Sequence, residues 1–460
     1  MANSTSDLHS TLILLSESIR ESLSRTFNKP PDSSDVSVKS LLESLLPPTN
    51  ETDFQTVLTN FSLLCAALAA SQTLTYDQLS WIPVSLSASA DSAFRELQKA
   101  FFDHRSKDLL VELMPLVLPL LKSSINESSI DKEDAGGDEV SAASARVPVA
   151  YAIVASYQFK WLVTQIDLQL LGNLCYLIIP CALTALDHWS PEVKGQGMVT
   201  LIHLAKHVSC SEFSLYEDVM LDACCQNIAS SDEIWEHVVE MSVLLVTCTQ
   251  QNNPRSAWFE KVLNEMLSHL WRQPRSKERR IGWLKHIEPL FSGMGIVLLG
   301  HFRRLFPLFF KWMHADDDAT VLLVLDSIKT VIKFTWIRYS PYYDKLVDEL
   351  VILYKDASLK VERENIRACI LQILILLQQC KGQQFEAAWI KHRHDPNLSA
   401  LCPQLTSCYV VILYLFLLIT FVVDYGHFFA LLLVGNIIEN SVGFCSGIPC
   451  MFSNSGSFVI

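Results

Sequence analysis

Residues 180–208 have the sequence PCALTALDHWSPEVKGQGMVTLIHLAKHV, which predicts two antiparallel helices joined by a tight turn. The first helix is expected to end at Asp187, after an apolar run. The second helix is expected to begin at Pro191, because proline fits the first helical position and Ser190 can cap the helix. Glu192 adds a negative charge to the first turn, where the helix dipole favours it. The segment therefore predicts a helical hairpin.

The second helix of this hairpin carries one apolar face. Val193, Gly197, Leu201 and Leu204 recur every three or four residues, so they lie on one side of the helix. Gly197 on that side permits another helix to approach closely. A single hairpin cannot bury its apolar faces alone and becomes stable when further hairpins stack on it. The fold therefore depends on whether the hairpin recurs along the chain.

Helices come in pairs from residue 147 to about residue 401, and no stretch alternates apolar and polar residues long enough to indicate a sheet. The predicted turns within the pairs are spaced by 45, 43, 42 and 39 residues. This period matches HEAT or armadillo units of about 40–47 residues better than repeats of about 33–34 residues. We expect an all-α, HEAT/armadillo-like helical-repeat solenoid. The predicted turns lie at Asp187, Asp232, Arg275 and Ser276, Asp317, and Asp356.

Acidic turns and basic second helices also suit a HEAT-like stack, in which such residues form a ladder. Asp187 with Lys194, and Asp356 with Lys360, have this placement. An exposed ion pair contributes at most about 1 kcal/mol, so the ladder would set geometry more than stability. An irregular helical bundle without a regular superhelix is the alternative.

Composition excludes some classes of function. The chain has 460 residues, of which 50% are hydrophobic and 18% charged, and a net charge of −13. This balance argues against nucleic-acid binding, which needs a concentrated basic surface. The 13 cysteines form no CxxC pair and lie mostly within apolar runs, so we expect unpaired, buried thiols in a reducing compartment. The N-terminus has no secretory-signal pattern, which predicts a cytoplasmic or nuclear location.

Four regions are predicted along the chain. Residues 1–122 form an N-terminal helical region, in which the apolar stretch 109–121 is too short to span a bilayer and contains two prolines expected to kink it. Residues 123–146 are polar and acidic and predict a disordered linker, with a phosphorylated interaction motif as the alternative. Residues 147–405 form the solenoid, and residues 406–460 form a hydrophobic tail.

The sequence contains no recognised catalytic or cofactor-binding motif. It lacks the phosphate-binding patterns GxxxxGK[ST] and GxGxxG and the nucleophile elbow GxSxG. His203 and His207 have the spacing of helical zinc ligands, but their segment HLAKH lacks the glutamate of HExxH. We therefore expect no catalytic residue, no metal site and no cofactor.

One basic cluster is a candidate partner site. The segment RQPRSKERR spans residues 272–280, falls at a predicted turn and lies between two tryptophans. A docking patch for an acidic or phosphorylated segment of a partner is one interpretation. A solvated turn and a nuclear-import signal are the alternatives. The basic residues of the patch are Arg272, Arg275, Lys277, Arg279 and Arg280.

The tail departs from the repeats. Residues 408–423 form an apolar run, a second run covers 428–438, and no Lys or Arg follows Arg393. One interpretation is a membrane hairpin through 408–438, since the first run approaches the roughly 17–25 residues of a spanning helix. A last buried helix pair is the second. A non-native end from an intron or a shifted frame is the third, favoured by the abrupt loss of charge.

Three segments of the chain resemble one known family. They are LTALDHWSPEVKGQGMVTLIHLAKHV, RRIGWLKHIEPLF and WIRYSPYYDKLVDELVILYKD. They resemble the family of the second Tel-two-interacting protein, a subunit of the Tel-two/Tti-one/Tti-two co-chaperone assembly, and the chain looks like a plant member. The resemblance covers about residues 150–405, and the tail from about Thr406 departs from it. The repeat signature is clearest at Asp187, Pro191, Val193, Lys194, Gly197 and Leu201.

The resemblance implies an adaptor rather than an enzyme. It implies as partners the Tel-two and Tti-one homologues, the heat-shock-protein-ninety chaperone machinery and client kinases related to phosphatidylinositol-three-kinase. The stability of these kinases bears on the DNA-damage response. A different HEAT adaptor, such as a transport or coat scaffold, and a membrane-anchored scaffold are the alternative functions. The residues themselves support a long protein-binding surface without a catalytic constellation.

Overall fold

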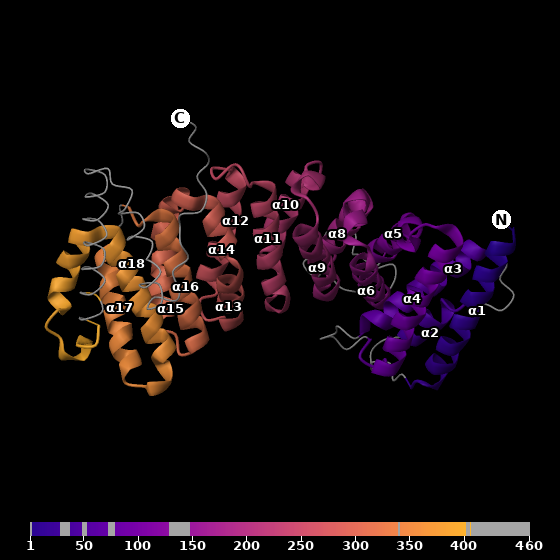
Figure 1. The fold of residues 1–460 in the computed structure, drawn as a ribbon, viewed down its shortest axis with the longest axis horizontal. Helices are drawn as coiled ribbons and strands as arrows, with labels where there is room; N and C mark the ends of the chain where they lie inside the picture. Colours follow the sequence, from indigo (N-terminus) through magenta and orange to yellow (C-terminus); the bar gives the residue numbers. More distant parts are fainter. Residues whose placement is uncertain are drawn as a thin grey trace, which may run out of the picture. The chain divides into compact units, whose positions relative to one another are not determined.

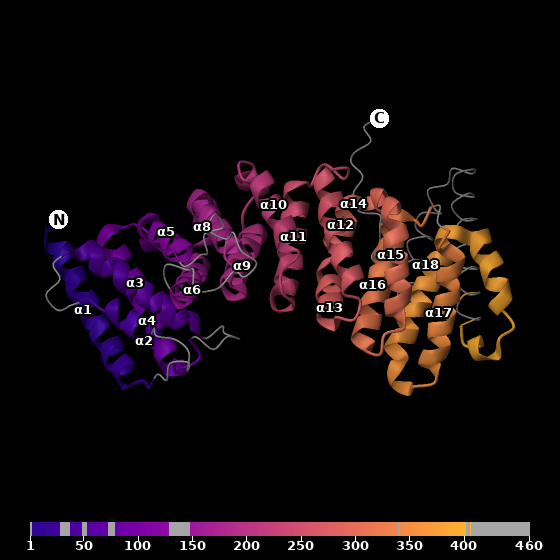
Figure 2. The same cartoon turned by 180° about the vertical axis from the view of Figure 1, so that it is seen from behind.

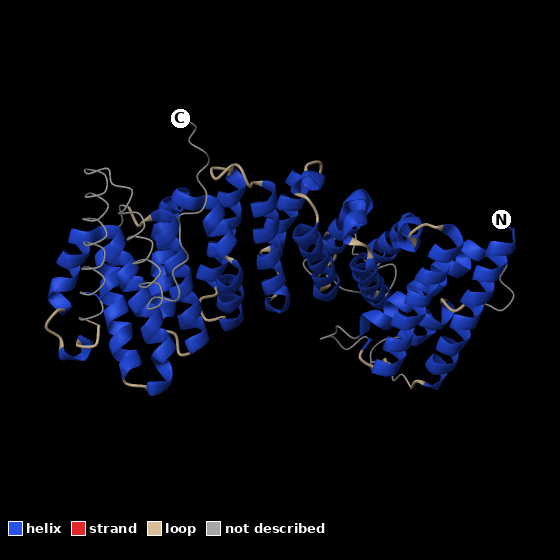
Figure 3. Ribbon diagram, viewed as in Figure 1, coloured by secondary structure: helices blue, strands red, loops and turns tan. Residues whose placement is uncertain are grey.

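The computed structural model describes residues 2–27, 37–47, 53–71, 79–127, 148–338, 341–401 and 405. The chain divides into two compact units, Met1–Ser340 and Pro341–Ile460. The described residues contain helices and no strand (Figure 3). The all-α prediction is therefore confirmed. The division at residue 340 falls inside the predicted solenoid, and the predicted linker and tail lie largely or wholly outside the described residues.

The first unit begins with helices that cap the stack. In Figure 1 they lie near the chain's N-terminus. α1 packs on α3 and α4, and α3 packs on α6. The helices of this part are α1 (Ala2–Arg25), α2 (Val38–Ser44), α3 (Phe54–Ala70), α4 (Val84–Arg105), α5 (Leu109–Glu127) and α6 (Val149–Gln165).

The helices that follow form successive pairs, seen from two sides in Figures 1 and 2. They are α7 (Leu168–Leu171), α8 (Cys175–Asp187), α9 (Pro191–His207), α10 (Glu217–Asn227), α11 (Trp235–Thr249), α12 (Ala257–Arg272), α13 (Lys277–His286), α14 (Glu288–Met294), α15 (Phe302–Met313) and α16 (Asp318–Thr335).

Two rows of helices build the solenoid of the first unit. One row runs α5, α8, α10, α12 and α15, and each helix contacts the next one in the row. The other runs α6, α9, α11, α13 and α16, with α14 continuing α13 after a break at Ile287. Each helix of one row therefore buries its apolar face against its pair partner and its neighbours in the row. This is the predicted helical-repeat solenoid.

The second unit is a further helix pair. α17 (Tyr343–Ser358) packs against α18 (Glu364–Trp389), and a distortion at Gly382 breaks the regular backbone of α18. Asp187 is the last residue of α8 and Asp356 lies inside α17, so two of the predicted turns begin slightly too early. The other three predicted positions lie between the two helices of a pair, and the observed turns recur with about the predicted period. They occupy residues 188–190, 228–234, 273–276, 314–317 and 359–363. We call the side of the first unit that carries its turns the turn edge.

The hairpin of α8 and α9 has the predicted local structure. Pro191 is the first residue of α9, and Val193 and Leu201 are fully buried. A Cβ atom on Gly197 would lie 2.9 Å from the Ala185 Cβ and 3.0 Å from the Ala182 carbonyl oxygen. The two helices therefore cross at a distance that only glycine permits.

Aromatic side chains fill the space between consecutive pairs. Trp235, Trp283 and Trp312 are buried, and the rings of Trp283 on α13 and Trp312 on α15 meet edge to face at 5.9 Å. Such pairs add about 0.5–1.5 kcal/mol beyond the burial of their area. These tryptophans thus join neighbouring helices through the core.

Two predictions about individual segments are wrong. α5 is 19 residues long rather than 13, and it continues through Pro115 and Pro119. Both prolines face solvent, where water can satisfy the carbonyl groups that lose their helical partner. By length and composition alone, α5 and the helical segments Leu168–Asp187 and Glu288–Met313 could cross a membrane.

The second wrong prediction concerns the cysteines. Cys210 and Cys248 are joined by a disulfide, whereas Cys65, Cys175, Cys181 and Cys224 are buried free thiols as expected. The start and the end of an antiparallel helix pair lie at the same edge of the stack. Cysteines 38 residues apart, about one repeat, are therefore brought together.

We predict that Gly197→Ala destabilises the protein, although alanine favours a helix by about 1 kcal/mol over glycine. The new methyl group would overlap α8 backbone atoms that cannot turn away, at a cost of about 1–3 kcal/mol. The matched control is Gly195→Ala on the same helix, whose Cβ would meet only Ile234 at 3.5 Å. Chemical denaturation should show Gly197→Ala less stable than Gly195→Ala, and the reverse order would contradict the close crossing.

Candidate functional site

The basic cluster at residues 272–280 lies on the turn edge, between α12 and α13. Ser276 caps α13 by accepting a hydrogen bond from the Arg279 backbone N–H at 3.3 Å. Arg272 ends α12, and Lys277 begins α13. The cluster is thus on two helix ends and faces the turns of the pairs before and after it.

Arg279 of the cluster points into the protein. Its side chain is 3% exposed, and its guanidinium pairs with the Asp232 carboxylate and donates to the Ser230 carbonyl oxygen at 2.7 Å. The same group lies 4.5 Å from the centre of the Trp235 ring. In return, the Trp235 indole N–H donates to the Arg279 carbonyl oxygen at 3.0 Å. Arg279 therefore fastens α13 to the turn of the preceding pair.

Arg280 and Lys277 face the opposite way. The Arg280 guanidinium lies 3.5 Å from the Asp317 carboxylate, and the Lys277 ammonium lies 3.9 Å from it. Asp317 also caps α16, because it accepts from the backbone N–H and the hydroxyl of Thr320, both at 2.9 Å. Arg280 is mostly buried, with 14% of its side chain exposed. These residues fasten α13 to the turn of the following pair.

The charge of Asp317 reflects these contacts. Partial burial alone would raise the pKa of its carboxyl group. The two hydrogen bonds from Thr320 and the positive charges of Lys277 and Arg280 outweigh that effect and hold the pKa below its usual value. Asp317 is therefore ionised in the folded protein at neutral pH.

The structure changes the interpretation of the predicted partner patch. Arg279 is buried and Arg280 nearly so, because each pairs with an acidic turn one repeat away. Arg272, Arg275 and Lys277 are exposed. Trp271, beside them, is 47% exposed. The available patch is thus smaller than predicted, and the rest of the cluster holds three consecutive pairs together.

Lys194, just after the turn at residues 188–190, makes a similar contact with the next pair. Its ammonium donates to the Asn227 side-chain oxygen at 3.1 Å, and Asn227 ends α10 in the next pair. Asp187, the residue predicted beside it, is the last residue of α8. The predicted ladder at Asp187 and Asp356 does not single out the clearest bridges, which lie at Asp232 and Asp317.

Further polar bridges connect helices of the same row, and sequence reasoning missed them. The sequence feature that could have revealed these bridges is a pair of complementary polar residues about one repeat apart. Lys206 on α9 contacts Glu240 on α11 at 2.7 Å, and Lys285 on α13 contacts Glu236 on α11 at 3.1 Å. In the other row, Lys261 on α12 contacts Asp222 on α10 at 2.9 Å, and Arg304 on α15 contacts Asn264 on α12 at 2.6 Å.

The other candidate functional residues in the described part of the chain are not arranged as a catalytic or metal-binding site. The His203 and His207 rings lie 4.7 Å apart, and burial together with the neighbouring His207 lowers the pKa of His203. Within the described ranges, no group of three or more His, Cys, Asp or Glu side chains is placed to hold a metal ion. The open depression of about 300 Å³ between α3 and α5 is lined mainly by Thr, Asn and Leu side chains.

Comparison with known proteins found relatives of this chain, although no protein-family model matches. At2g39910, an uncharacterized protein of Arabidopsis thaliana, is 53% identical over 416 residues, which cover 87% of the chain and 95% of that protein. TELO2-interacting protein 2 of Mus musculus is 22% identical over 298 residues, which cover 60% of the chain and 54% of the mouse protein.

Two solved structures resemble the chain in their helical fold. Yeast importin-beta (Kap95p) has a TM-score of 0.36 and 12% identity, covering 85% of the chain and 52% of that protein. Kap121p bound to RanGTP has a TM-score of 0.30 and 11% identity, covering 84% of the chain and 46% of that protein. The chain thus spans about half the length of each.

We predict that Arg279→Ala lowers the free energy of unfolding by about 2–4 kcal/mol, since it removes a buried cation and leaves its partners unpaired. Arg275→Ala, an exposed neighbour, should change it by less than about 0.5 kcal/mol. Arg279→Lys should not restore stability, because an ammonium cannot reproduce the planar fork of the guanidinium. Urea denaturation of the three variants tests this; equal midpoints for Arg279→Ala and Arg275→Ala would contradict the assigned role.

We predict that Asp317→Asn costs about 1 kcal/mol at neutral pH, since it removes the charge that Lys277 and Arg280 face. Because the folded-state pKa is lowered, this contribution is complete above the unfolded pKa of about 4 and is lost as pH falls through the folded value. The stabilities of the parent and the variant should therefore converge at acidic pH. Thermal unfolding from pH 7 to pH 3, with Asp316→Asn as control, measures this; a pH-independent gap would disprove it.

Proposed function

We propose that this chain, which belongs to the family of the Arabidopsis thaliana protein At2g39910, is a non-enzymatic scaffold that binds other proteins. The fold supports this proposal, because two rows of helices present long surfaces made of many helices. The polar residues that first suggested a site are engaged largely in holding neighbouring pairs together. What remains for partners is extended surface, which suits recognition by shape and by a few anchoring residues.

The finer proposal is a co-chaperone subunit. The observation that carries it is the 22% identity with mouse TELO2-interacting protein 2, which runs over 298 residues. We infer that the chain binds the Tel-two and Tti-one homologues of its own cell. With the chaperone machinery, the assembly would support the folding and abundance of kinases related to phosphatidylinositol-three-kinase. The proposed location is the cytoplasm, the nucleus or both.

Affinity purification from cell extract tests this proposal. The full chain, expressed with an affinity label and extracted without detergent, should recover both the Tel-two and the Tti-one homologue in amounts similar to its own. An unrelated helical-repeat protein of similar net charge is the control. Recovery of neither homologue would count decisively against the co-chaperone role. Recovery of transport or coat components instead would indicate another adaptor, and a chain that sediments with membranes would contradict the proposed location.

The exposed part of the basic cluster is tested in the same experiment. The double variant Arg272→Glu and Arg275→Glu changes only exposed side chains, so its melting temperature should equal that of the parent. Loss of the partners at an unchanged melting temperature would place the interface on the turn edge. Full recovery of the partners would remove Arg272 and Arg275 from it.

A further inference from the structure

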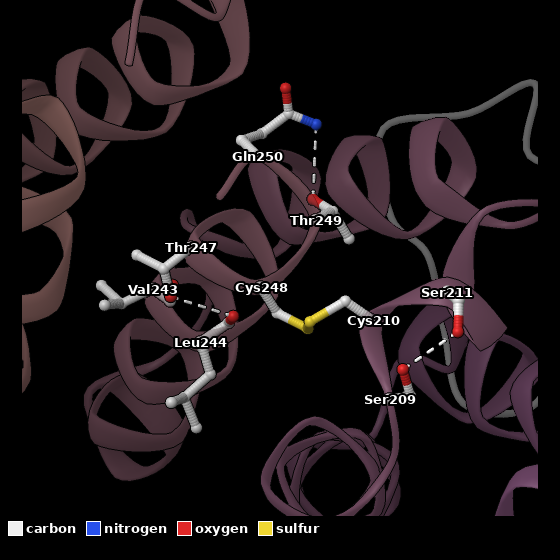
Figure 4. Close-up of a disulfide and its surroundings, with 9 residues drawn as sticks. All are labelled: Ser209, Cys210, Ser211, Val243, Leu244, Thr247, Cys248, Thr249 and Gln250. Atoms are coloured by element: carbon white, nitrogen blue, oxygen red, sulfur yellow. Dashed lines mark hydrogen bonds between the residues drawn. A yellow bond between two sulfur atoms is a disulfide. The ribbon is translucent and has the colours of Figure 1, made fainter. Parts of the chain in front are cut away.

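The disulfide between Cys210 and Cys248 encloses one complete helix pair. Cys210 begins the short helix Cys210–Phe213, which connects α9 to α10, and Cys248 is next to the last residue of α11. Figure 4 shows the bond spanning from this connection to α11. The two Cα atoms are 5.7 Å apart, within the usual range for disulfides. Residues 210–248 therefore form a covalent loop that contains all of α10 and all of α11 except its last residue.

This position matters because of how a solenoid is stabilised. Each pair contacts only the pairs before and after it, so a single pair can open locally without unfolding the whole stack. Opening of α10 and α11 separates the two ends of the pair. A bond between those ends removes the most extended open states and so disfavours opening.

The two cysteines are also more exposed than Cys224, one of the two free thiols in the same loop. Cys210 and Cys248 are half-buried, and the flanking Ser209 and Ser211 are exposed. Cys224, inside the same loop, is buried, and burial raises the pKa of its thiol to about 12. A small thiol or disulfide in solution can therefore reach Cys210 and Cys248 more readily than it can reach Cys224.

We propose that Cys210 and Cys248 are a reversible thiol–disulfide pair whose oxidation closes the pair α10–α11 into a covalent loop and suppresses its local opening. The oxidant is a small disulfide of the glutathione class. One cysteine thiolate attacks it, which forms a mixed disulfide and releases one glutathione thiolate. The second cysteine thiolate then attacks the protein sulfur of the mixed disulfide and releases the second glutathione. Two protein thiols are oxidised, and one glutathione disulfide is reduced to two glutathione molecules.

Formation of the bond is tested first by mass. The segment between Lys206 and Arg255 contains no other Lys or Arg, so trypsin releases it as one peptide, residues 207–255. The full chain is equilibrated with glutathione disulfide, free thiols are alkylated, and this peptide is analysed without reduction. We expect a peptide in which Cys210 and Cys248 escape alkylation, and a return to alkylation after treatment with reduced glutathione. Alkylation of both cysteines under oxidising conditions would overturn the proposal.

The effect on local opening is tested by native proteolysis. A glutamate-specific protease can cut after Glu233, in the exposed turn between α10 and α11. We expect the oxidised chain to be cut about tenfold more slowly there than the reduced chain, because cleavage follows the open population. The two fragments of a cut chain should separate on a gel only after reduction. Equal cutting rates in both redox states would overturn the proposal.

Two variants complete the experiment. Cys210→Ser with Cys248→Ser should be cut at the rate of the reduced parent under both conditions. Cys225→Ser removes a half-buried thiol from the same loop and should keep the full difference between oxidised and reduced protein. A redox-dependent rate that persists in the double variant would assign the effect to another cysteine and refute the pair. The comparison of oxidised with reduced parent remains decisive if a variant fails to fold.

Discussion

Contact between one helix pair and the next is the constraint on which the first unit depends. No pair can bury both of its faces alone, so each relies on apolar packing by residues such as Trp283 and Trp312. That packing is non-directional and would tolerate sliding of one pair on another. The charged bridges of the turn edge are directional, because the planar guanidinium of Arg279 makes its contacts only when Asp232, Ser230 and Trp235 are correctly positioned. Apolar burial provides stability, and the bridges fix the register.

The position of these bridges explains why a cluster that looks like a binding site is mainly structural. Five basic residues in nine would form a strongly positive patch if all were exposed. In the stack, acidic turns stand on both sides of them at a distance of one repeat. Arg279 and Arg280 are neutralised by those turns, so a partner meets a mixed surface rather than a positive one. Charge in a repeat protein therefore has to be counted across neighbouring repeats.

The sequence predicted the architecture well because the relevant signals are local. Pro191 and the acidic turns mark helix starts, and their spacing gives the repeat period. The burial of Arg279 was not predictable by the same means, since its partners lie 44 to 49 residues away and none is unusual for a turn. The bond between Cys210 and Cys248 was missed for the same reason. Residues one period apart need to be compared directly before such contacts become visible.

The two edges of the first unit differ in the length of the connections between their helices. Most turns on the turn edge are short and carry caps and bridges, as at residues 273–276 and 314–317. The longest connections lie on the other side: residues 208–216 join α9 to α10, and the seven-residue helix Gly295–His301 joins α14 to α15. Insertions and deletions among related chains should therefore accumulate in these connections, and an inserted sequence or fused domain is better placed there.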